Sequence, residues 1–253
     1  MLQSIPARRQ LSPAAAADSP RLFERAIRAS RIRHLYWHAA TRLAEKRPYL
    51  QMLERASQLD GDVIECGVYQ GKSLLRIATW LKERGISKMI HGLDSFDGFP
   101  RDGISEADLG RGRTLQQVRQ RFRGASQFPY RILRTAADLD LPIKLHVGYF
   151  EETLPRLIAS GKQFCFVHLD CDLYESYRLC LEKLFDATVK GGVILFDEYK
   201  STVWRGATRA IDEFLASHRE PLEVCEDLGR PAGWGKYYVT KELTQRGEIR
   251  RAA

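Results

Sequence analysis

Residues 164–176, FCFVHLDCDLYES, decide the fold. They begin with a near-continuous apolar run and end in acidic residues, Asp170 and Asp172. Strands of a parallel sheet have this character because helices cover both faces of the sheet. Residues 191–199, GGVILFDEY, repeat the pattern, with Asp197 and Glu198 after the apolar run. The two stretches therefore predict two strands of a parallel α/β sheet, each with acidic residues at its carboxyl end.

The acidic residues after these two strands favour a metal or catalytic site. Ligands of open α/β sheets bind outside the carboxyl ends of the strands, so carboxylates from both strands converge on one crevice. Oxygen ligands of this kind suit Mg²⁺, Ca²⁺ or Mn²⁺. The alternative is that Asp170 and Asp197 cap the helices that follow. A single acidic strand end fits capping well, whereas two ends with four carboxylates favour the site.

A second motif lies upstream, in DVIECGVYQGKS, residues 62–73. A short buried strand at 62–66 leads into a turn with two glycines, and helical periodicity follows at 74–81. The glycines let the backbone approach a ligand, and a helix N-terminus offers free N–H groups. A third strand, at 88–93, ends at Asp94, which follows Gly67 by 27 residues. This is near the spacing of a ribose-binding carboxylate, so the whole segment indicates a nucleoside cofactor.

The same glycine turn mimics a phosphate-binding loop. That loop needs four residues between its two glycines, and only three separate Gly67 from Gly71. A nucleotide triphosphatase is therefore disfavoured. Lys72 is interpreted as a solvated residue of the first helical turn.

Five motifs follow one another between about Asp60 and Phe214. They are ECGVYQGKS (65–73), LDSFDGFP (93–100), GYFEETLP (148–155), LDCDLYES (169–176) and FDEY (196–199). In this order they resemble the motifs of the macrocin O-methyltransferase (TylF/MycF-type) family, which methylates sugar hydroxyls in antibiotic biosynthesis. Two positions depart from the family's usual pattern. Glu198 stands where a second Asp is usual, and Cys171 stands where Gly is common.

The resemblance implies the fold of class I methyltransferases: α/β, with a Rossmann-like, doubly wound and mostly parallel sheet of seven strands and an N-terminal helical extension. It implies S-adenosyl-L-methionine as cofactor, with Mg²⁺, or alternatively Mn²⁺, held by Asp170, Asp197 and Glu198. Asp170 is also the first candidate for the catalytic base, and Asp172 is the second. The residues expected around the cofactor are Glu65, Gly67, Tyr69, Gly71, Ser73, Asp94, Ser95, Phe96 and Phe150.

The expected function is metal-dependent transfer of a methyl group to a hydroxyl of a sugar or glycosylated natural product. One alternative acceptor is a catechol or another vicinal diol. Catechol enzymes of this fold use a Lys three residues after the first metal Asp, where this chain has Leu173. The other alternative is a module that binds the cofactor without chemistry, against which the intact carboxylates argue. His168 is interpreted as a core histidine with satisfied hydrogen bonds, or else as support for the metal ligands.

The net charge of +8 is concentrated at the ends of the chain. The first 60 residues hold eleven Lys or Arg against five Asp or Glu, and residues 241–253 hold four against two. We therefore expect a basic, partly disordered arm with a helical lid or dimer extension (1–59), the methyltransferase domain (60–240) and a basic tail (241–253). A charge-balanced core disfavours a nucleic-acid partner. The expected partner is a small hydroxyl acceptor, and a homo-oligomer stays open.

No apolar run approaches the roughly 20 residues of a membrane helix, and residues 1–20 lack a segment resembling a secretory signal. No membrane partner is therefore expected. The five cysteines show no pairing pattern and indicate a reducing, cytoplasmic location.

Residues 101–112 are expected to be a mobile loop, and Tyr36 and Trp37 are expected to pack against the protein rather than contact substrate. The remaining strands are expected at 144–147, 164–169, 193–196, 222–226 and 236–239, and the helices at 42–59, 114–122, 153–159, 174–185 and 207–216.

Overall fold

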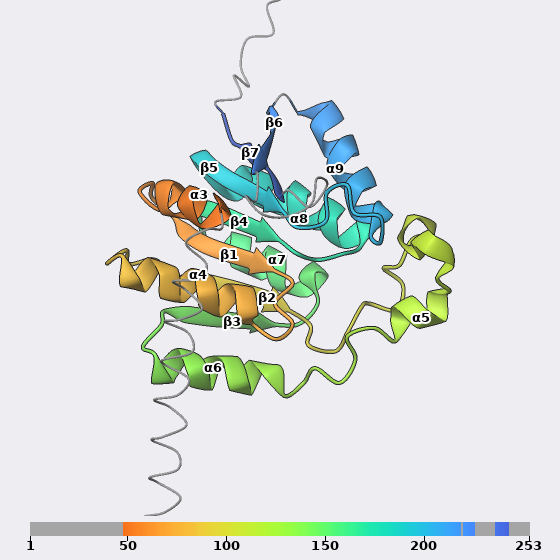
Figure 1. Ribbon diagram of the computed structural model, residues 1–253, viewed down its shortest axis with the longest axis horizontal. Helices are drawn as coiled ribbons and strands as arrows, with labels where there is room; N and C mark the ends of the chain where they lie inside the picture. Colours follow the sequence, from red (N-terminus) through yellow and green to blue (C-terminus); the bar gives the residue numbers. More distant parts are fainter. Residues whose placement is uncertain (1–47, 219, 226–235, 243–253) are drawn as a thin grey trace, which may run out of the picture.

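The structure, a computed structural model, describes residues 48–218, 220–225 and 236–242. Its seven strands form one sheet in the order β3-β2-β1-β4-β5-β7-β6 (Figure 1). Strands β1 to β5 are parallel, while β7 is antiparallel to both β5 and β6. The predicted doubly wound, mostly parallel sheet with an antiparallel edge is confirmed. The strands are β1 (Asp62–Cys66), β2 (Ile90–Asp94), β3 (Ile143–Val147), β4 (Phe164–Leu169), β5 (Thr188–Phe196), β6 (Leu222–Cys225) and β7 (Lys236–Thr240).

Helices cover both faces of this sheet because consecutive residues of the central strands, which point to opposite faces, are apolar. Val63 and Phe166 belong to the core cluster on one face, and Ile64 and Val167 to the cluster on the other. The first face carries α3 (Pro48–Ala56), α4 (Lys72–Glu83) and α6 (Phe128–Asp138). The second carries α7 (Phe150–Ala159), α8 (Tyr174–Ala187) and α9 (Arg205–Ser217).

The chain bends sharply after each of the four central parallel strands. A non-glycine residue with positive φ follows every one of them: Tyr69 (46°) after β1, Phe96 (52°) after β2, Asp172 (62°) after β4 and Lys200 (60°) after β5. Such backbone conformations are costly for residues with a Cβ and persist where the surrounding structure imposes them. The carboxyl edge of the sheet is therefore the strained edge of the molecule.

The segment beyond this edge differs from the expected mobile loop. It contains a 3₁₀ helix, η1 (Glu106–Gly112), and the short helix α5 (Leu115–Arg119), and both lie past the tips of the parallel strands (Figure 1). Asp108 is fully buried there, accepting hydrogen bonds from the backbone N–H groups of Ser105 and Tyr174 at 2.8 and 2.9 Å. The loop prediction is thus wrong for residues 106–112, because a buried carboxylate ties them to the start of α8. The helix expected at 114–122 ends earlier, at Arg119.

Helix α3 precedes the boundary expected at residue 59, yet it packs on the sheet. Leu50 and Leu53 are fully buried in the same core as α4. The rest of the expected helical extension, with Tyr36 and Trp37, and the tail from residue 243 lie outside the described residues. Within the described ranges, no helix has both the length and the apolar character needed to cross a bilayer.

Candidate active site

A cavity of about 1150 Å³ opens at the carboxyl ends of the central strands. All four predicted acidic residues line it, namely Asp170, Asp172, Asp197 and Glu198. Six of the nine residues expected around a cofactor also line it: Gly67, Tyr69, Ser73, Asp94, Ser95 and Phe150. The other three do not. Glu65 and Phe96 are buried behind the wall, and a Cβ at Gly71 would meet the side chain of Ile132.

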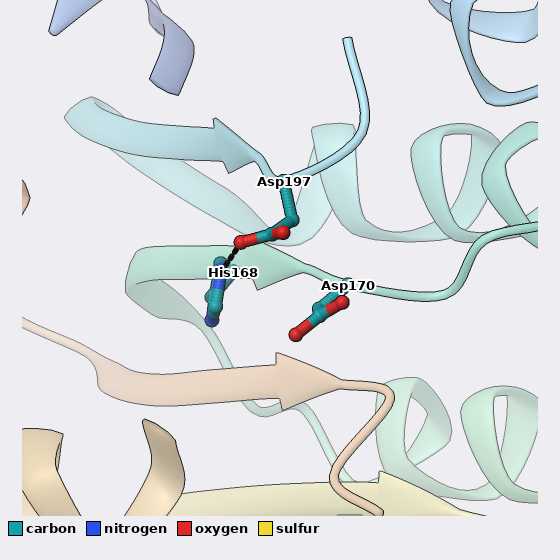
Figure 2. A group of neighbouring side chains, drawn as sticks. All are labelled: His168, Asp170 and Asp197. Carbon is teal, nitrogen blue, oxygen red and sulfur yellow. Dashed lines mark ion pairs between the residues drawn. The ribbon is translucent and has the colours of Figure 1, made fainter. Parts of the chain in front are cut away.

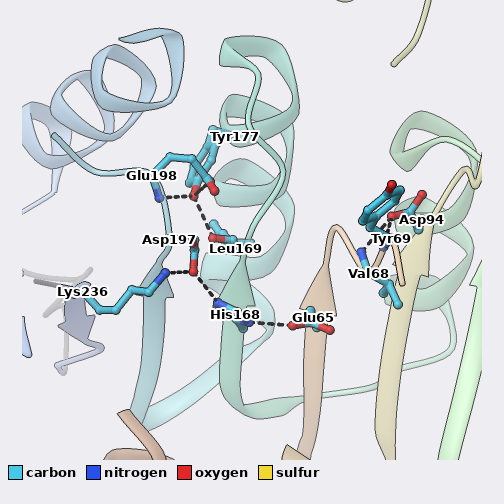
Figure 3. Close-up of polar contacts among 10 residues, drawn as sticks. All are labelled: Glu65, Val68, Tyr69, Asp94, His168, Leu169, Tyr177, Asp197, Glu198 and Lys236. Carbon is cyan, nitrogen blue, oxygen red and sulfur yellow. Dashed lines mark hydrogen bonds and ion pairs between the residues drawn. The ribbon is translucent and has the colours of Figure 1, made fainter. Parts of the chain in front are cut away.

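Asp94, at the end of β2, organises the glycine turn after β1. Its Oδ2 accepts hydrogen bonds from the backbone N–H groups of Val68 and Tyr69, both at 2.8 Å (Figure 3). Its Oδ1 accepts one from the N–H of Phe96 at 2.7 Å. A carboxylate offers about four acceptor positions, so three backbone donors leave it capacity for a ligand. We call this part of the cavity, lined by Gly67, Tyr69, Ser73 and Asp94, the glycine-turn half.

Gly67 brings the glycine-turn half against the acidic strand end of β4. Its φ is +91°, and a Cβ there would overlap the carbonyl oxygen of Asp170. The backbone N–H of Asp170 in turn donates to the carbonyl of Cys66 at 2.9 Å. Only glycine permits both the conformation and this approach of two backbones. The turn after β1 and the acid after β4 are therefore placed by one contact.

Four polar side chains form a row across the central strands on one face of the sheet, and we call them the polar row: Glu65 (β1), His168 (β4), Asp197 (after β5) and Lys236 (β7). His168 Nδ1 lies 2.8 Å from Glu65 Oε1, and His168 Nε2 lies 3.4 Å from Asp197 Oδ1 (Figure 3). Lys236 forms an ion pair with the same Asp197 oxygen. Glu65 and His168 are buried, so their contact fixes the histidine ring.

His168, Asp170 and Asp197 form a group that suits a cation. One potential ligand atom of each lies within 4.8 Å of those of the other two (Figure 2). His168 was expected to be a satisfied core histidine or else a support for the metal ligands, and its buried Nε2 has no hydrogen-bond partner among the described residues. With Nδ1 engaged by Glu65, Nε2 faces two carboxylates, an arrangement that a metal ion would stabilise. The donor set therefore fits a divalent ion.

Glu198 is oriented differently from the other acids. Its Oε2 and the carbonyl oxygen of Leu169, which lies 2.7 Å from the hydroxyl of Tyr177, are both within hydrogen-bond reach of that hydroxyl and share its one proton (Figure 3). Burial, together with the charges of Asp170 and Asp172, raises the pKa of Glu198. Burial and the charge of Asp170 likewise raise the pKa of Asp172. The carboxylates repel one another in the absence of a cation, which is a further sign that the site suits one.

Cys171, beside these acids, has no nucleophilic character. Burial raises the pKa of its thiol to about 12, so the reactive thiolate is absent at neutral pH. The described cysteines Cys66, Cys165, Cys171 and Cys180 are all free thiols.

The opposite wall of the cavity is aromatic and basic, and the sequence did not reveal it. Phe99, Phe122 and Trp204 pack edge-to-face with centroid distances of 5.3 and 5.5 Å. Arg121 and Lys200 line the cavity beside them. These residues come from the segment after β2 and the segment after β5. These two segments come together only in the folded protein. Within the sequence motifs, only the aromatic residues of LDSFDGFP pointed to this wall. We call this wall the aromatic half.

Comparison with known proteins agrees with this geometry. The chain is 29% identical over 157 residues to an 8-demethyl-8-(2,3-dimethoxy-alpha-L-rhamnosyl)-tetracenomycin-C 4'-O-methyltransferase of Streptomyces olivaceus, covering 60% of this chain and 58% of that protein. It is 26% identical over 173 residues to a demethyldecarbamoylnovobiocin O-methyltransferase of Streptomyces niveus, covering 68% and 63%. The chain thus spans less than two thirds of the length of these curated relatives.

Solved structures share the fold. The calicheamicin methyltransferase CalS11 superposes with a TM-score of 0.63 at 23% identity, over 94% of this chain and 99% of that one. The O-methyltransferase NovP gives a TM-score of 0.62 at 21% identity, over 77% and 80%. The seven-stranded sheet is therefore that of class I methyltransferases. The sequence matches the family described as Macrocin-O-methyltransferase (TylF) over residues 15–238, and the chain belongs to this family.

Proposed function

We propose that the protein transfers the methyl group of S-adenosyl-L-methionine to a hydroxyl of a sugar in glycosylated natural-product biosynthesis. One observation carries the proposal: the glycine-turn half and the acidic strand ends open into a single cavity. The relative from Streptomyces olivaceus is named for 4'-O-methylation of a rhamnosyl tetracenomycin, which supports a sugar as acceptor.

In this proposal the glycine-turn half holds the cofactor. Gly67, Tyr69 and Ser73 line the space for its methionine end, Asp94 accepts hydrogen bonds from the ribose, and Ser95 and Phe150 border the adenine. Glu65, Gly71 and Phe96 support this wall from behind. The methyl sulfonium is already activated, so these residues serve chiefly to align the methyl group with the acceptor oxygen.

Asp170 and Asp197 are the proposed metal ligands, with Glu198 as the third ligand predicted from the sequence and His168 Nε2 as a further donor beside them. A Mg²⁺ or Mn²⁺ ion bound there would lower the pKa of the acceptor hydroxyl. Asp170 is the first candidate to take the hydroxyl proton, and Asp172, which also lines the cavity, is the second. Asp170→Asn is expected to lose turnover in either role, because Asp170 is also a proposed metal ligand, so Asp172→Asn decides between them: retained turnover leaves Asp170 as the base, and lost turnover with cofactor and metal still bound assigns the base to Asp172.

The test is methyl transfer to a panel of glycosides and nucleotide-sugars, with cofactor affinity measured by calorimetry. Asp197→Asn is expected to abolish turnover and to leave cofactor affinity within a few fold, because the acids face the acceptor. Asp186→Asn, an exposed acid outside the cavity, is the matched control and retains activity. Full turnover of Asp197→Asn would contradict the proposal. Full turnover of the unmodified protein in excess chelator would show that the reaction needs no metal ion.

A further inference from the structure

Two cations of the aromatic half, Arg121 and Lys200, form no ion pair with a carboxylate of the described residues. Arg121 lies with its guanidinium carbon 5.2 Å from the ring centroids of both Phe122 and Trp204. Lys200 Nζ lies 4.9 Å from the Tyr237 ring centroid. Within the described ranges, no carboxylate comes within the 4.0 Å of an ion pair with either. Both line the cavity, so both charges are available to a ligand.

Two neighbouring cations, Lys236 and Arg113, are bound to groups of the protein. Lys236 pairs with Asp197, and Arg113 donates to the carbonyls of Asp108 and Val203 while its guanidinium stacks on Trp204 at 4.2 Å. These contacts hold the wall together. Arg121 and Lys200 instead lie over aromatic rings of the described residues, which orient a cation without neutralising it. The charge of Arg121 also partly offsets the rise in the pKa of Asp172, but the two side chains form no ion pair.

Both cations lie in turns with an unusual backbone conformation. Lys200 itself has a φ of 60°, and Phe122, next to Arg121, has a φ of 63°. Backbone conformations of this kind persist where the surrounding structure imposes them, so the fold defines the turns that carry the two cations. The two residues come from segments far apart in the sequence and open on the same cavity.

The cavity is lined by both acids and cations. The four acids lie at the strand ends, and Arg121 and Lys200 lie on the aromatic half. A ligand that matches these charges has a neutral, hydroxyl-bearing part at the acids and an anionic part at the two cations. A planar guanidinium fork and a separate ammonium suit phosphate oxygens, and two cations from different segments match a group with more than one phosphate better than a single carboxylate.

We propose that Arg121 and Lys200 form an anion subsite for the phosphates of a nucleoside diphosphate sugar, so that the acceptor is the activated sugar rather than the finished glycoside. This rests on the proposed methyl transfer and names its substrate class. The methylation then precedes the glycosyl transfer that consumes the nucleotide-sugar.

The test is calorimetric titration of the full chain, saturated with S-adenosylhomocysteine, with uridine diphosphate. EDTA is included so that no divalent ion bridges the phosphates to the acids. Uridine diphosphate is expected to bind, and Arg121→Gln and Lys200→Gln to weaken it roughly tenfold each, as expected for loss of one charge-assisted contact. Arg123→Gln is the matched control, because its exposed side chain is bonded to the Arg119 carbonyl outside the cavity, and it leaves affinity unchanged. Arg121→Lys keeps a charge and shows an intermediate loss.

Three results would overturn the subsite: no binding of uridine diphosphate to the unmodified protein, equal affinity in all variants, or binding of methyl glucuronide in its place. Titration of S-adenosylhomocysteine into the same samples separates the two proposals. A protein that binds S-adenosylhomocysteine but not uridine diphosphate loses only the anion subsite. A protein that binds neither loses the methyl transfer as well.

Discussion

Gly67 makes a contact that no other residue type allows. A side chain at this position would meet two obstacles: the positive φ, and the overlap of its Cβ with the Asp170 carbonyl oxygen. Gly67→Ala is therefore expected to lower the free energy of unfolding by roughly 3–5 kcal/mol and to weaken cofactor binding. The measurements are urea denaturation and calorimetry.

Gly85→Ala is the control for this substitution. Gly85 also has a positive φ, 68°, but a Cβ there would meet nothing within 4 Å, so it carries the conformational cost alone, about 1–2 kcal/mol. If both variants lose the same free energy of unfolding, the backbone around Asp170 moves away from the added Cβ at no cost. The contact with Gly67 would then not be what positions the acidic strand end.

Glu198 tests the metal site, because it is one methylene longer than the Asp usual at its position. Mg²⁺ demands near-ideal octahedral geometry, whereas Mn²⁺ accepts more varied sites. We expect Glu198→Asp to remain active and to shift relative activity from Mn²⁺ toward Mg²⁺, measured as turnover with each ion. Wild-type behaviour with both ions would mean that Glu198 is not a ligand and that its bond to Tyr177 is its main role.

The convergence of Asp170 and Asp197 could be predicted from sequence because both follow apolar runs that only neighbouring parallel strands explain. Lys236 could not, since its ion pair with Asp197 depends on β7 lying beside β5. The same holds for the Glu65–His168 contact. Both residues are central in apolar strands, and the register that places them opposite each other is a property of the folded sheet.

Among the elements, η1 depends on a buried carboxylate. Asp108 accepts from Ser105 and Tyr174, and its Oδ1 packs so closely on Gly206 that a Cβ there would overlap it. Asp108→Asn replaces one acceptor oxygen with an NH₂ group facing donors. We expect a loss of about 2–3 kcal/mol in unfolding free energy and faster tryptic cleavage at the arginines of residues 101–123.

Asp102→Asn, a change at an exposed neighbour, is the control and should leave the unfolding free energy within about 0.5 kcal/mol of that of the unmodified protein. Unchanged proteolysis of Asp108→Asn would mean that other contacts suffice to hold η1.

Strand β4 was predicted to the residue, because a run of five apolar residues and His168 lies between polar segments, and all six positions are buried in the sheet. Helix α6 was not predicted. It buries only Ile132, Thr135 and Ala136, so its apolar stripe is too narrow to stand out from the surrounding polar residues. The error at η1 has another cause: the contacts of Asp108 with α8 are long-range and leave no local pattern.

For the molecule as a whole, a histidine pair makes stability depend on pH. His91 Nδ1 lies 2.9 Å from His146 Nε2, and Asp62 with Lys162 lies on the other side of His91. Burial, with the charges of His91 and Lys144, lowers the pKa of His146 to about 4. Burial lowers that of His91 as well. Between pH 6.5 and 4 the unfolded chain therefore binds protons at these histidines that the folded chain does not bind. The contribution of the neutral histidines to the free energy of unfolding is present above pH 6.5 and is lost as the pH falls toward 4.

We expect unfolding free energy to be about 1 kcal/mol lower at pH 5 than at pH 7 on account of His146, after discounting for its partial exposure to solvent. Urea denaturation at the two pH values measures it. His146→Gln removes the titrating group and should flatten the dependence by that amount. An equally steep dependence in His146→Gln would assign it to other groups.

Strand β7 inserts between β5 and β6, although β6 precedes it in the chain. During synthesis, residues 188–225 therefore leave the ribosome before the strand that joins them. Until residues 236–240 follow, the edge of β5 stays open and Asp197 lacks the ammonium of Lys236. An open strand edge is a template for pairing with another chain. The nascent protein is thus most exposed to association with its neighbours in the interval between these two strands, and the acidic strand ends acquire their counter-charge only when that interval closes.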